Sequence, residues 1–198
     1  MTERQTLYAG LSRAAWGCFF LYFDLNLGRI NLLPDFVGCL LLLSAIRLLE
    51  QEQRDLRLLR PLGVFLALYT AANAAVTLLG GEIREGLLTL LVQVAQLYFL
   101  FQLFTDCAAI AARYQGEGDR LDRRLLFWRK WQTICLTAAY ILVYLPRFAW
   151  MQTAALCAAA VSLFAGFWAM RAIFALRKLF REEEAHSAPP GIDASDET

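Results

Sequence analysis

The chain has 198 residues, of which 59% are hydrophobic and 19% are charged, and its formal net charge is only +1. Soluble domains are usually about half apolar and about a quarter charged, so this composition predicts a membrane protein with several spans. A net charge this small does not indicate any particular class of binding partner. Nucleic-acid binding would need a basic soluble domain, and the sequence shows none.

Six apolar runs are candidates for membrane helices, since about 20 apolar residues cross a hydrocarbon core about 30 Å thick. They cover residues 8–27, 32–49, 61–79, 87–107, 131–145 and 150–171. The second and fifth are short, and at about 1.5 Å per residue they need snorkelling at Arg47 or a thinner bilayer. We therefore expect an all-α polytopic membrane domain over residues 1–181, with six transmembrane helices arranged as three hairpins. Residues 182–198 are polar and acidic and contain proline, so we expect a disordered cytoplasmic tail.

The basic residues predict how these helices are oriented. Cytoplasmic connections retain lysine and arginine, and with six spans sixteen of the nineteen basic residues fall on one side. Each of the three connections on the other side holds one, namely Arg29, Arg84 and Arg147. Both termini are therefore expected in the cytoplasm. The first run has basic flanks like a signal peptide, but it lacks a small-residue cleavage site, so we expect a retained helix.

The stretch "DLNLGRINLLPDFVG" places several polar residues between the first two apolar runs. Gly28 can end one helix, Asn31 can cap the next, and Pro34 and Asp35 suit a first helical turn. Most of the stretch is thus explained as a hairpin cap. Asp24 is different, because an ionised side chain inside a membrane helix needs a partner or water.

Three amides lie at a depth similar to that of Asp24 on the third and fourth runs. They are Asn73, Gln93 and Gln96. Such amides can simply hydrogen-bond between helices as packing contacts. We also predict, as a hypothesis, that Asp24 and these amides form an outward-facing polar pocket that binds a small ligand.

The run "INLLPDFVGCLLLL", preceded by "FFLYFDLNLG", resembles a family of small uncharacterised polytopic membrane proteins of Gram-positive bacteria. The resemblance covers about residues 16–49. It implies a bacterial cytoplasmic membrane and brings no activity, ligand or catalytic residue. Cys39 departs from the aromatic residue expected at that position in the family's pattern.

A basic segment with interleaved aromatic residues runs from Asp119 to Lys130. Its composition is typical of a helix lying in an anionic headgroup layer. We expect Arg120, Arg123 and Arg124 to contact lipid headgroups. The alternative is that these charges only fix the topology.

Signatures of enzymes and cofactors are largely missing from the sequence. It has no HExxH, GxSxG or P-loop motif, and "GEGD" at Gly116–Asp119 lies in a polar loop where its aspartate could not act within a membrane. The single histidine is in the tail and the five cysteines are widely separated, so no metal or other cofactor is expected. We expect no enzyme, but a membrane module that binds a partner protein or anionic lipid. The alternative is a small-solute or ion permease that acts as a homo-oligomer.

Overall fold

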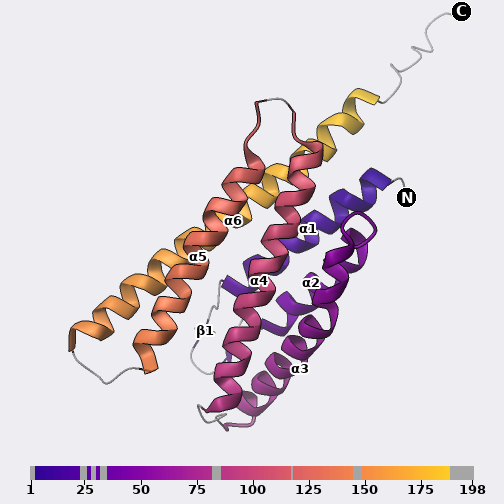
Figure 1. Ribbon diagram of the computed structural model, residues 1–198. Helices are drawn as coiled ribbons and strands as arrows, with labels where there is room; N and C mark the ends of the chain where they lie inside the picture. Colours follow the sequence, from indigo (N-terminus) through magenta and orange to yellow (C-terminus); the bar gives the residue numbers. More distant parts are fainter. Residues whose placement is uncertain are drawn as a thin grey trace, which may run out of the picture.

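The computed structural model describes residues 3–22, 26–27, 30–31, 35–81, 86–116, 118–144 and 149–187. Within these ranges the chain forms six α-helices (Figure 1): α1 (Glu3–Tyr22), α2 (Asp35–Leu49), α3 (Leu59–Leu78), α4 (Leu87–Tyr114), α5 (Leu121–Tyr144) and α6 (Ala149–Ser187). A short 3-10 helix, η1 (Arg54–Leu58), leads into α3. Two strands of two residues, β1 (Asn26–Leu27) and β2 (Ile30–Asn31), pair antiparallel between α1 and α2. The all-α prediction is confirmed.

Neighbouring helices pack against one another around a shared core. α1 contacts α2 and α6, α2 contacts α3, and α5 contacts α4 and α6. Figure 1 shows that the start of α1, η1, the start of α5 and the last part of α6 lie at one end of the bundle. We call this end the basic end, because most lysines and arginines of the described residues belong to these segments.

Two glycines allow α1 and α2 to approach closely. A Cβ atom added at Gly17 would lie 2.7 Å from the Cγ atom of Leu42 and 3.0 Å from the carbonyl oxygen of Gly38. A Cβ atom added at Gly38 would lie 3.0 Å from the carbonyl oxygen of Gly17. Small residues at facing positions are how membrane helices bring their backbones together.

The core is formed by apolar side chains from all six helices. Its largest fully buried members include Leu11, Leu42, Ile46, Leu103, Phe104, Leu125 and Ile173. Side-chain hydrogen bonds join α5 and α6 to the other helices. Arg129 donates to Thr105 at 2.6 Å, Arg177 donates to Ser12 at 3.0 Å, and Gln132 donates to Tyr22. These contacts fix the α5–α6 pair against α1 and α4.

Three helical segments are long and apolar enough to cross a membrane: Arg54–Leu78, Leu87–Tyr114 and Trp150–Arg181. Large apolar side chains on them are exposed, among them Leu68, Leu88, Tyr98 and Leu156. Exposed apolar surface of this extent is typical of a protein that lies in lipid. The three other helices do not combine this length with an apolar composition. α2 has only 15 residues, whereas the first three turns of α1 and of α5 contain charged residues.

Several helix boundaries differ from those expected. α1 ends at Tyr22 rather than near Leu27, and α4 continues to Tyr114, beyond the expected end at residue 107. α5 begins ten residues before the expected span, because the basic segment is its first turns rather than a separate surface helix. α6 runs to Ser187, six residues into the expected tail, and residues 188–198 lie outside the described part of the chain.

Candidate functional site

The start of α5 is fixed by its own loop. The side-chain oxygen of Gln115 accepts hydrogen bonds from the backbone N–H groups of Leu121 at 3.0 Å and Asp122 at 3.3 Å. These are two of the N–H groups that lack partners at the beginning of a helix. Gly118 has a φ of 106°, a conformation that few other residues adopt, and it turns the loop toward α5. The first helical turn is thereby held in place, and the arginines on it have a defined position.

Basic and aromatic residues share one face of α5. Arg120, Arg124 and Phe127 follow a spacing of four and then three residues, and Trp128 is adjacent to Phe127. Residues three and four apart lie on the same side of a helix. The adjacent side of α5 faces the core, because Leu121 and Leu125 are buried. Phe127 remains 51% exposed.

A matching face comes from α6. Trp168, Arg171, Ala172 and Ala175 follow the spacing i, i+3, i+4 and i+7 and therefore share one side of the helix. The rings of Trp128 and Trp168 stack across the two helices, with centroids 5.8 Å apart and planes inclined by 14°. The guanidinium carbon of Arg171 lies 5.1 Å from the centroid of the Trp168 ring, within the range of a cation–π contact.

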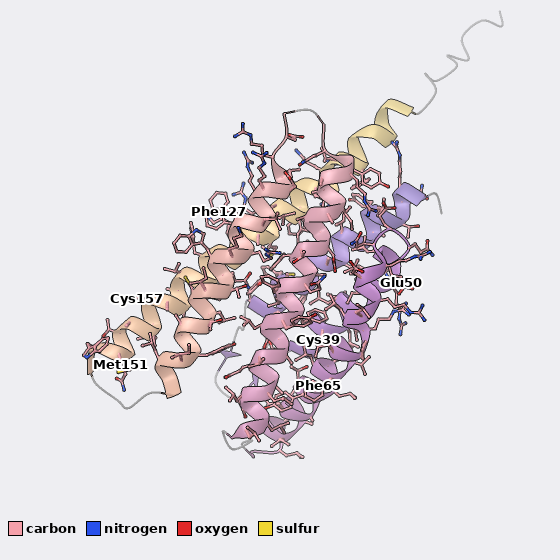
Figure 2. All side chains as sticks on the ribbon, viewed as in Figure 1. Cys39, Glu50, Phe65, Phe127, Met151 and Cys157 are labelled. Carbon is pink, nitrogen blue, oxygen red and sulfur yellow. The ribbon has the colours of Figure 1, made fainter. Side chains whose placement is uncertain are left out.

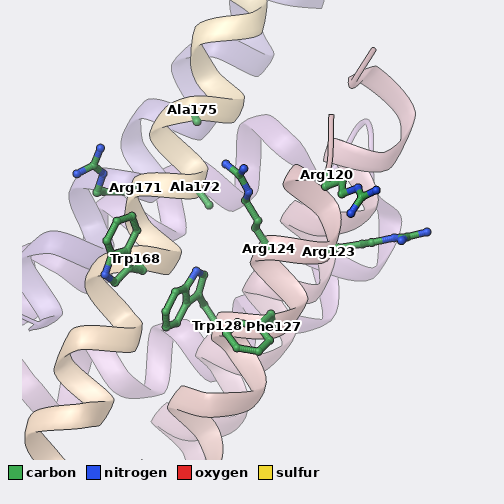
Figure 3. Close-up of a pocket in the computed structure, with 9 residues that line it drawn as sticks. All are labelled: Arg120, Arg123, Arg124, Phe127, Trp128, Trp168, Arg171, Ala172 and Ala175. Atoms are coloured by element: carbon green, nitrogen blue, oxygen red, sulfur yellow. The ribbon is translucent and has the colours of Figure 1, made fainter. Parts of the chain in front are cut away.

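The two faces enclose a groove of about 800 Å³, which we call the α5–α6 groove. Its lining residues are Arg120, Arg123, Arg124, Phe127, Trp128, Trp168, Arg171, Ala172 and Ala175 (Figure 3). Figure 3 shows Arg124 extending from α5 toward Ala172 and Ala175, while Arg123 points away from α6. The small alanine side chains leave space beside Arg124. The groove is open to the surface and cationic toward the basic end, and its other end is aromatic.

The arginines of this groove differ from those that stabilise the fold. Arg60 forms a salt bridge with Glu50 at 2.6 Å, and Arg113 forms one with Glu52 at 3.0 Å. Within the described part of the chain, the guanidinium groups of the four groove arginines have neither a salt bridge nor a hydrogen bond: Arg120, Arg123, Arg124 and Arg171. Their positive charge is therefore available to a ligand.

Arg123 is partly compensated by its neighbour. The pKa of the Asp122 carboxyl lies below its usual value, mainly because of a hydrogen bond with Gln115 and further because of a backbone hydrogen bond and the charge of Arg123. Asp122 is therefore an anion at neutral pH. Its negative charge offsets that of Arg123, which already points away from the groove (Figure 3).

A second surface cavity of about 550 Å³ lies near η1 and is lined by Glu50, Gln51, Arg54 and Arg57. It has no aromatic side chain, so it lacks the apolar wall of the α5–α6 groove. Figure 2 shows Glu50 and Phe127 on opposite sides of the bundle. The two arginines of this cavity are therefore useful controls for the loss of positive charge away from the groove.

The three arginines predicted to contact headgroups lie together at the α5–α6 groove. The prediction missed Trp168, Arg171, Ala172 and Ala175, which form the other wall. Their helical spacing is visible in the sequence, but it does not reveal that they face α5.

The predicted polar pocket is only partly described. Asp24 lies outside the described residues, Asn73 is exposed on α3, and Gln93 is half-buried on α4. Gln96 borders a cavity of only about 10 Å³ whose other lining residues include Thr70 and Phe99, but neither Asn73 nor Gln93. The four-residue pocket therefore stays a prediction.

The groove can bind a ligand through its positive charges and its aromatic side chains. In the part of the chain that the structure describes, no group of three or more histidine, cysteine, aspartate or glutamate side chains is placed to hold a metal ion. Comparison with family models, curated proteins and solved structures finds no match to this chain. The fold and the groove thus define the class: a helical protein suited to a membrane, with a cationic and aromatic surface groove.

Proposed function

We propose that this protein is a six-helix integral membrane protein whose α5–α6 groove binds the headgroup of an anionic lipid without catalysing a reaction. In this arrangement the helices form three hairpins, and the basic end and both termini lie in the cytoplasm. The resemblance of the first hairpin favours a bacterial cytoplasmic membrane. The grouping of the basic segments at one end supports this orientation, because cytoplasmic segments retain positive charge.

One observation carries the lipid proposal: the groove changes from cationic to aromatic along the helix axes. Arg124 lies nearer the basic end than Trp128, and four residues of helix separate them by about 6 Å. Tryptophan is favoured at the boundary between headgroups and hydrocarbon, with arginine above it at the phosphates. A lipid has the same order of groups, a phosphate followed by apolar chains.

The apolar wall favours a lipid over a soluble anion. Phe127 is 51% exposed, Trp131 is 48% exposed and Phe164 is 56% exposed, on the part of α5 and α6 that continues away from the basic end. These side chains would contact acyl chains while the guanidinium groups contact the phosphate. The permease alternative has less support, because the cavity at Gln96 has room for about 10 Å³ only.

Lipid binding by variants of the full-length protein tests the proposal. The protein is purified in nanodiscs of phosphatidylcholine with a small fraction of phosphatidylglycerol, and the bound anionic lipid is counted by native mass spectrometry. Each basic residue near a membrane surface contributes about 1 kcal/mol to anionic-lipid binding. Arg124→Gln with Arg171→Gln should therefore weaken binding by about 2 kcal/mol, or roughly 30-fold.

The matched control is Arg54→Gln with Arg57→Gln, which removes the same charge at the other surface cavity. This control should bind phosphatidylglycerol like the unmodified protein. Equal losses in the two double variants would show that binding follows overall charge, with no role for the groove. No preference for phosphatidylglycerol in the unmodified protein would refute lipid binding itself.

A further inference from the structure

The α5–α6 groove carries more positive charge than a lipid with one phosphate can neutralise. Arg120, Arg124 and Arg171 have no anionic partner among the described residues, and Arg123 is offset by Asp122. A phosphodiester headgroup such as phosphatidylglycerol supplies one negative charge. A headgroup with two phosphates would neutralise a second guanidinium group, so the groove should attract it more strongly than a headgroup with one phosphate.

Figure 3 shows the guanidinium groups of Arg120, Arg124 and Arg171 at three separate places around the groove. Arg120 and Arg124 are one helical turn apart, which separates their attachment points by about 6 Å along α5. Arg171 projects from α6, and in Figure 3 it lies on the side of this helix away from Arg124. Because arginine binds phosphate best with two parallel hydrogen bonds, arginines at separate places suit separate phosphates.

The aromatic residues limit the paths that bound acyl chains can take along the groove. The stacked pair Trp128 and Trp168 closes the space between the helices on the side away from the basic end (Figure 3). Chains must therefore leave the groove on either side of this pair, over Phe127 on α5 and over the outer face of α6. A lipid with chains on both sides of a shared headgroup fits this division. The volume of about 800 Å³ is in the upper part of the usual range for a small-molecule site.

We propose that the α5–α6 groove selects lipids with two phosphates in one headgroup, such as a diphosphatidylglycerol, over lipids with a single phosphate. This inference rests on the proposed function and names the lipid class for the same groove. One phosphate lies at Arg124, beside Ala172 and Ala175, and the other lies at Arg120 toward the basic end, while Arg171 adds positive charge from α6. The short polyol bridge spans one helical turn.

Quenching of tryptophan fluorescence by brominated acyl chains tests the selectivity. Two of the five tryptophans, Trp128 and Trp168, line the groove, so chains bound there should quench them first. The full-length protein is reconstituted in phosphatidylcholine with brominated diphosphatidylglycerol, or with twice the mole fraction of brominated phosphatidylglycerol. The two series then match in phosphate and in chains. We expect half-maximal quenching at a phosphate content at least tenfold lower in the first series.

Variants and a soluble competitor separate the possible outcomes. Arg124→Gln with Arg171→Gln should abolish the difference between the two series, and Arg54→Gln with Arg57→Gln should preserve it. Equal quenching per phosphate in the unmodified protein would overturn the two-phosphate inference, while leaving anionic-lipid binding intact. Displacement of the brominated lipid by millimolar inorganic pyrophosphate would also overturn it, because a soluble diphosphate would then satisfy the site. If neither lipid quenches more than brominated phosphatidylcholine, the proposed function fails as well.

Discussion

The contact between α1 and α2 at Gly17 can be tested by filling the space that glycine leaves. In Gly17→Ala the new methyl group would lie 2.7 Å from the Cγ atom of Leu42, which is fully buried. Overpacking of a dense core costs about 1–3 kcal/mol. Alanine also favours the helix by about 1 kcal/mol relative to glycine. The net loss in free energy of unfolding is therefore about 0–2 kcal/mol. A change this close to zero would not by itself show that the two helices are in close contact.

A double-mutant cycle removes this ambiguity. In a Leu42→Ala background the two closest side-chain atoms are gone and the carbonyl oxygen of Gly38 remains 3.0 Å from the new methyl group, so Gly17→Ala should lose most of its cost and can stabilise the protein by up to about 1 kcal/mol. The coupling between the two changes should then be about 1–3 kcal/mol. The assay is unfolding of the purified protein in mixed micelles with increasing sodium dodecyl sulfate, followed by circular dichroism. Effects that add to within about 0.5 kcal/mol would refute the contact and the close approach of α1 and α2.

Two further predictions concern topology and the aromatic wall. A cysteine that replaces Arg84 in a cysteine-free background should react with an impermeant maleimide in intact cells, and one that replaces Arg54 should react only after permeabilisation; the reverse pattern would contradict the orientation. Trp168→Ala removes the stacked pair with Trp128 and the edge contact with Phe164 at 5.9 Å, so it should lower the free energy of unfolding by about 1–3 kcal/mol. Trp168→Phe should retain most of that stability in the same micelle assay, and equal losses in both variants would argue against ring stacking.

The presence of each helix could be predicted from the sequence more reliably than the residues at which it begins and ends. The apolar runs predict six helices, because a long run of apolar residues can be read directly from the sequence. The ends of α5 and α6 differ from the prediction because charged residues also form helix when one face is buried. Leu121 and Leu125 provide that face on α5 and continue the helix through the basic segment. Hydropathy alone excludes this segment from the span and so misplaces the start of the helix.

Only the α5 part of the candidate site could be predicted, because its arginines lie close together in the sequence. Arg120, Arg123 and Arg124 attract notice as a cluster, whereas Arg171 is isolated between apolar residues on α6. Its place in the groove depends on the antiparallel packing of α5 and α6, which brings Trp168 onto Trp128. That register is a tertiary property. The structure also separates Arg124 from Arg123, whose side chain points away from the groove (Figure 3).

The most direct test of the central claim is to map where an anionic lipid touches the protein. Phosphatidylglycerol with a photoactivatable group near the start of one acyl chain would be added to the protein in nanodiscs, and the crosslinked peptides would be identified by mass spectrometry. We predict adducts on α5 around Phe127 and Trp128 and on α6 around Trp168, reduced by unlabelled anionic lipid and absent in Arg124→Gln with Arg171→Gln. Adducts confined to α3 and α4, or labelling of α5 and α6 that is unchanged in the double variant, would contradict lipid binding at the groove.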